Sequence, residues 1–62
     1  MKIYNVTVGF LMTDGRLYCR VIYPIKARDT EEAAAIVYNY LSLRMEPNFR
    51  IIKVEEVKGN EN

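Results

Sequence analysis

Few side chains in this sequence are suited to catalysis. There is no histidine, and the single cysteine, Cys19, therefore has no histidine partner to activate it as a nucleophile. A cysteine without a basic neighbour usually behaves as a small apolar residue, so we interpret Cys19 as part of the core. The sequence also contains no glycine-rich phosphate-binding loop. These residue types predict a non-enzymatic protein with no cofactor and no small-molecule substrate.

The acidic pairs Glu31-Glu32 and Glu55-Glu56 are the remaining candidates for site chemistry, as ligands of a hard cation. Neighbouring residues point apart on a helix and to opposite faces of a strand, so neither pair makes a site alone. We interpret the first pair as charges favoured by a helix N-terminus and the second as solvated surface. A metal site would form only if the fold brought the two pairs together, and we predict none.

Arg16, Tyr18 and Arg20 share one parity along a predicted strand, so we expect all three on its outward face. Gly9, expected opposite Arg20, would leave that face open to close approach. A basic sheet face with an aromatic side chain is how several RNA-binding modules stack bases. This pattern indicates a nucleic-acid face, although an ordinary solvated face with one tyrosine would look the same.

Two alternating runs and a turn position these side chains. The even residues from Tyr4 to Met12 are apolar, which is the period of a strand with one buried face. The Asp14-Gly15 dipeptide indicates a two-residue hairpin loop. This loop would place apolar residues opposite one another in the pairs Met12 and Leu17, Phe10 and Cys19, Val8 and Val21, and Val6 and Tyr23.

Residues 29–45 predict the single helix. Asp29 is suited to capping its start, Glu32 can reach back as in a capping box, and Pro47 would end it. One stripe of this helix is expected to cover the sheet, and it consists of Ala33, Ala34, Val37, Tyr38, Leu41 and Met45.

A second group of helix residues lies beside that stripe. Ile36, Tyr40 and Leu43 widen the apolar arc to roughly 220°, against the ~100° or slightly more that a surface helix needs. Arg44 lies within the arc, where its stem can lie flat. We expect these four residues to face a partner, and a second copy of the chain fits best. Burial under loops of the same chain is the other interpretation.

Residues 49–58 predict a third strand, with Ile52 and Val54 facing inward and a break in parity at 55–57. Pro24 favours an edge position for the second strand, so the third strand should pair with the first. The expected fold is therefore α+β, a β-β-α-β chain with an antiparallel sheet in the order 2-1-3 and the helix on one face, half of a ferredoxin-like unit. The inward residues would be Val6, Val8, Phe10, Leu17, Cys19, Val21, Ile52 and Val54.

The size of the chain bears on its association. A single domain over residues 1–58, followed by a polar disordered tail over 59–62, is marginal alone. One cysteine allows no intrachain disulfide, which leaves oligomerisation as the stabilising supplement. The sequence shows no membrane-spanning run and no signal peptide, so we expect a cytoplasmic protein. Residues 1–28 carry five basic residues and one acidic residue, whereas 29–62 carry four basic and seven acidic. This asymmetry suggests either two faces of opposite sign or head-to-tail complementarity between copies.

Three features together resemble the short phage inhibitors of uracil-DNA glycosylase. They are the run Tyr4-Asn5-Val6-Thr7, the Asp14-Gly15 turn followed by Tyr18, and a single helix before the last strand. The resemblance implies a dimer and a pocket of helix aromatics, near Tyr40 and Ile36, that captures an apolar side chain of the enzyme. That family is acidic, whereas the first half of this chain is basic.

These patterns lead to one functional prediction and one alternative. We predict a small protein-interaction module that acts as a homodimer through Ile36, Tyr40, Leu43 and Arg44. A virus- or mobile-element-encoded inhibitor or regulator of a host protein would fit this description. The alternative is a nucleic-acid-binding module that uses the basic hairpin face.

Overall fold

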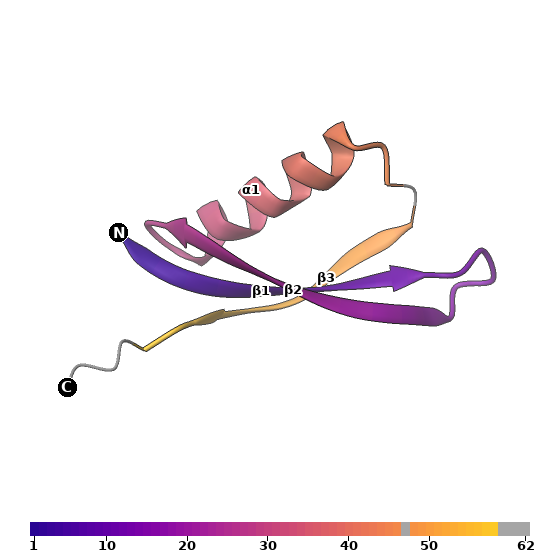
Figure 1. Cartoon of the computed structure of the whole chain (residues 1–62), viewed down its shortest axis with the longest axis horizontal. Helices are drawn as coiled ribbons and strands as arrows, with labels where there is room; N and C mark the ends of the chain where they lie inside the picture. The colour runs from indigo at the N-terminus through magenta and orange to yellow at the C-terminus, as the bar shows by residue number, and fades with distance from the viewer. Residues whose placement is uncertain (47, 59–62) are drawn as a thin grey trace.

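The chain folds as a three-stranded antiparallel sheet with one helix on one face. The computed structural model describes residues 1–46 and 48–58, so the predictions for Pro47 and for a tail over 59–62 lie outside the described residues. The elements are β1 (Lys2–Leu11), β2 (Leu17–Ala27), α1 (Thr30–Leu43) and β3 (Phe49–Glu56), and the sheet order is β2-β1-β3 (Figure 1). The predicted α+β class, β-β-α-β order and 2-1-3 strand order are confirmed.

Helix α1 begins at the predicted cap and ends earlier than predicted. The Asp29 carboxylate accepts a hydrogen bond from the Glu32 amide at 2.8 Å. Glu32 reaches back one residue beyond the cap, where its Oε1 accepts from the Arg28 amide at 2.7 Å. The helix closes before Met45, which adopts a left-handed conformation with φ 60°. The Met45 amide donates a hydrogen bond to the Ser42 carbonyl at 3.0 Å, and the Glu46 amide donates to the Leu41 carbonyl at 3.1 Å, which completes the terminus.

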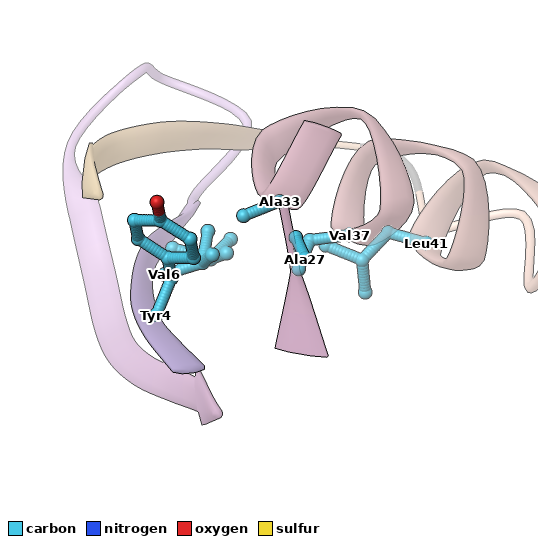
Figure 2. Packing of buried hydrophobic residues seen from close by; sticks show 7 residues of the cluster. Tyr4, Val6, Ala27, Ala33, Val37 and Leu41 are labelled. Carbon is cyan, nitrogen blue, oxygen red and sulfur yellow. The ribbon is translucent and has the colours of Figure 1, made fainter. Parts of the chain in front are cut away.

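The core lies between α1 and the inner face of the sheet. Val6 and Val8 of the central strand are fully buried, as are Val37 and Leu41 of the helix. Figure 2 shows the helix residues pointing toward the sheet, and the whole buried cluster consists of Tyr4, Val6, Val8, Ala27, Ala33, Val37 and Leu41. This core is small, and the tip of the β1–β2 hairpin projects past the helix (Figure 1). No helix in the described part of the chain is long and apolar enough to cross a membrane.

The hairpin turn is one residue longer than predicted. The Met12 amide donates to the Arg16 carbonyl at 2.7 Å, and the Gly15 amide donates to the Met12 carbonyl at 2.9 Å. The loop is therefore Thr13-Asp14-Gly15, with Gly15 at φ 90°, a conformation that glycine adopts without strain. This is a three-residue loop in which glycine takes the left-handed position, and the predicted two-residue Asp14-Gly15 loop is wrong.

A bulge in β2 absorbs the extra residue of the turn. Leu17 pairs with Leu11 rather than Met12, but the predicted pairs Phe10 and Cys19, Val8 and Val21, and Val6 and Tyr23 are present. Tyr18 is the extra residue between these two stretches. As a result, Leu17 lies over Gly9 on the outer face, and Tyr18 lies beside Phe10 and Cys19 on the helix side. The predicted faces of Leu17 and Tyr18 are therefore wrong and must be exchanged.

A second bulge lies in β3, earlier than the parity break predicted at 55–57. Lys53 pairs with Thr7 and Ile51 pairs with Val8, so Ile52 has no partner of its own in the ladder. Ile51 packs against the core and Ile52 lies against Gly9 on the outer face. The prediction that Ile52 faces inward is wrong, because Ile51 takes that place, whereas Val54 packs against the core as predicted.

Candidate interaction surface

The predicted partner residues form an exposed flank of α1, which we call the helix flank and define as Ile36, Tyr40, Leu43 and Arg44. The exposed fractions are 40% for Ile36, 48% for Tyr40 and 84% for Leu43. The Arg44 guanidinium carbon lies 5.6 Å from the centre of the Tyr40 ring, within the range of a cation–π contact. The described residues of the chain therefore leave this apolar flank largely uncovered.

Two tyrosines fix α1 over the sheet. Tyr40 meets Tyr23 of β2 edge-on, with ring centres 6.2 Å apart, and Tyr38 meets Phe49 of β3 at 5.5 Å. The helix flank therefore lies toward the β2 edge of the sheet. Burial, followed by the nearby Tyr40 and the Glu46 carboxylate, raises the pKa of Tyr23 above its ordinary value. Tyr23 is therefore neutral at physiological pH and serves as packing for the flank.

The opposite face of the sheet, which we call the open face, has no covering element among the described residues (Figure 1). Ladder pairing, together with the two bulges, assigns fifteen residues to it. Its aliphatic members are unusually many for a solvated antiparallel face. These residues are Ile3, Asn5, Thr7, Gly9, Leu11, Leu17, Arg20, Ile22, Pro24, Lys26, Arg50, Ile52, Lys53, Glu55 and Val57.

Charge is divided between the two sides of the molecule. The open face carries four cations and one carboxylate, a net charge of +3, whereas α1 and the residues that flank it, 28–46, carry four carboxylates and two cations, a net charge of −2. On the open face, the Lys53 ammonium lies 3.7 Å from the Glu55 carboxylate, and Arg20 and Arg50 form no ion pair within residues 1–46 and 48–58. The two faces of opposite sign suggested by the sequence are thus a property of the fold.

The three residues predicted to form a nucleic-acid face do not lie together. Arg16 stays at the turn, where its Nε donates to the Asp14 carboxylate at 2.8 Å. Arg20 lies on the open face beside Gly9, and Tyr18 lies on the helix side because of the β2 bulge. The open face is basic, but none of its described residues is aromatic.

The remaining candidates for chemistry are also separated. Cys19 lies half-buried in a hollow with Phe10 and Tyr18, at the edge of the core rather than within it. Glu32 belongs to the helix start, where the bonds from Arg28 lower the pKa of its carboxyl. Glu55 lies on the open face, and nowhere in the described ranges do three histidine, cysteine or acidic side chains come together to hold a metal ion.

Sequence reasoning missed the role of Leu17, Ile52 and Arg50 on the open face. The signal was present as runs of adjacent apolar residues, Leu17-Tyr18-Cys19 and Ile51-Ile52. A strand with one buried face alternates, so two apolar neighbours mark a place where parity can change. Such runs are where a bulge should be sought.

No family model matches the chain, and the comparisons with curated proteins and with solved structures also found no match. They add nothing to the resemblance to the phage inhibitors, so function has to be inferred from the surfaces themselves.

Proposed function

We propose that this chain is a non-enzymatic protein-interaction module that acts as a homodimer through the helix flank. The observation that carries the proposal is the exposure of Ile36, Tyr40 and Leu43 on a helix that already buries Ala33, Val37 and Leu41 against its own sheet. A two-fold dimer would place the same flank of two helices in contact, so each copy would cover the exposed residues of the other.

The size of the core supports association. Seven apolar residues form the buried cluster, and two of them are alanines. A chain of this length buries only ~60% of its unfolded surface and commonly needs a disulfide, a metal or a partner for stability. Its single cysteine is free, and the described residues contain no metal cluster, so a partner is the supplement that the chain can use.

Charge placed on the flank should abolish the dimer. In Ile36→Glu and in Tyr40→Glu, two buried carboxylates would face each other across the two-fold axis, which is strongly unfavourable. We expect both variants to sediment as a folded monomer at concentrations where the wild type is a dimer. Far-UV circular dichroism checks that the helix persists in each variant.

Ala35→Glu is the matched control, since it introduces the same group on the same helix at an exposed position away from the flank. We expect Ala35→Glu to remain dimeric. Equal sedimentation of the wild type and the flank variants would reject the helix flank as the interface.

The alternative of a nucleic-acid-binding module is less well supported, because Tyr18 is absent from the open face and base stacking would have no aromatic platform there. Regulation of a host protein, a viral origin and a cytoplasmic location stay predictions. The fold and the comparisons bear on none of them.

A further inference from the structure

Two independent bulges converge on one glycine at the centre of the open face. A Cβ atom built on Gly9 would lie 2.8 Å from Leu17 Cδ1 and 2.8 Å from Ile52 Cδ1. Glycine therefore lets a side chain from β2 and one from β3 meet above the central strand. Each of these side chains is on this face only because its own strand bulges, and bulges of this kind re-aim side chains in functional sheets.

The result is an apolar patch with a cationic border. Leu17, Ile22 and Ile52 are 44%, 57% and 41% exposed. Arg20 and Ile52 line both of the shallow hollows on this face, and Arg50 lines the hollow nearer the turn. An antiparallel sheet that only faced water would carry polar residues at these positions. We define this set of five residues as the bulge patch.

The chemistry of the bulge patch discriminates between occupants. A second copy packed face to face would bring two surfaces of net charge +3 together, which opposes association. Single-stranded nucleic acid would complement the positive charge, but its bases would contact only aliphatic side chains and no aromatic ring on which to stack. An acidic protein segment with apolar side chains satisfies both the charge and the aliphatic surface.

The position of the bulge patch on a face of the sheet indicates that the bound segment is helical. An added strand would pair with an edge of the sheet rather than cover the bulge patch on its face, and at the β2 edge it would also meet Pro24, which cannot donate to a ladder. The inner face of the same sheet already accepts a helix through aliphatic residues of β1 and β3, with Ala33 and Val37 of α1 against it. We propose that the open face binds an acidic amphipathic helix of a partner protein, laid across the bulge patch.

This inference does not depend on the homodimer, because the patch and the helix flank are on opposite sides of the sheet. A displayed library of random peptides, selected on the immobilised wild-type protein at low salt, tests it without a known partner. We expect the enriched peptides to be acidic, with apolar residues three and four positions apart. We expect Ile52→Asp and Arg50→Glu each to weaken their binding by more than about tenfold.

Arg16→Glu is the matched control, because it reverses an equal charge at the turn, outside the patch. It should leave binding within about twofold of the wild type. If Ile52→Asp fails to fold, Arg50→Glu still tests the bulge patch by itself. Enrichment of basic or neutral peptides, equal binding by the patch variants, or no enrichment would each overturn the proposal. Binding of oligothymidylate with the same loss in Arg50→Glu would overturn it in favour of nucleic acid.

Discussion

Deletion of Ile52 should remove the β3 bulge and leave the fold intact. Because Ile51 and Ile52 are identical neighbours, either deletion gives the same chain, and the ladder can keep an isoleucine opposite Val8 on the inner face. Lys53 would then follow directly and still pair with Thr7. The bulge patch would lose one of its five residues, but the core would lose none.

The expected change in stability is small because two effects oppose each other. Ile52 is 41% exposed, and full burial of an isoleucine is worth about 1.5–3 kcal/mol, so the deletion loses roughly 1–2 kcal/mol. A regular ladder regains a hydrogen bond worth about 0.5–1.5 kcal/mol. We expect the free energy of unfolding to change by less than about 1 kcal/mol, against a total of ~3–9 kcal/mol for a chain of this size.

Guanidinium unfolding followed by far-UV circular dichroism measures this change. Deletion of Thr7 is the control, because β1 pairs on both sides and a missing residue there would turn one half of its core residues outward. We expect that control to be unfolded. A loss of more than about 3 kcal/mol on deletion of Ile52 would refute the bulge, since only an in-register core residue has so large an effect.

Four further substitutions test the packing, the helix end and the helix start. Leu41→Ala should lower the free energy of unfolding by about 2–5 kcal/mol because Leu41 is fully buried. Leu43→Ala should keep the helix and reduce only the stabilisation that comes from dimerisation, which depends on protein concentration. Met45→Gly should raise stability by about 1 kcal/mol in thermal unfolding, because Met45 is left-handed and 85% exposed; a decrease would contradict the observed helix end. Glu32→Gln should lower the melting temperature near neutral pH, where the Glu32 carboxylate is bound by Arg28. Since the folded-state pKa of Glu32 is lowered, this difference should be full above its unfolded pKa of about 4.3 and should vanish as pH falls through the folded pKa; a difference that persists in acid would contradict it.

The order of elements was readable from the sequence because its signals are local or repeated. Asp29 caps the helix as predicted, and Pro24 was sufficient to place β2 at an edge. The pairing of Val6 with Tyr23 and of Val8 with Val21 was predicted from alternation and a two-residue loop, and it is present because the bulge at Tyr18 offsets the longer turn. Each of these features depends on residue type and spacing rather than on packing.

The face on which each side chain lies could not be predicted in the same way near the turn and in β3. Alternation assigns a face by counting from a fixed point, and one unpaired residue inverts every assignment between it and the end of the strand. The three-residue loop shifts the register, and the bulge at Tyr18 restores it from Cys19 onward. Of two adjacent isoleucines, only tertiary contact decides that Ile51 enters the core and Ile52 turns outward. The open face could therefore not be assembled from parity.

The solution mass of the wild-type chain tests homodimerisation most directly. Sedimentation equilibrium over a range of micromolar concentrations gives this mass without any variant. We expect a reversible dimer at twice the 7.3 kDa of one chain. A mass that stays at 7.3 kDa across the whole range would contradict the proposal that the helix flank is covered by a second copy.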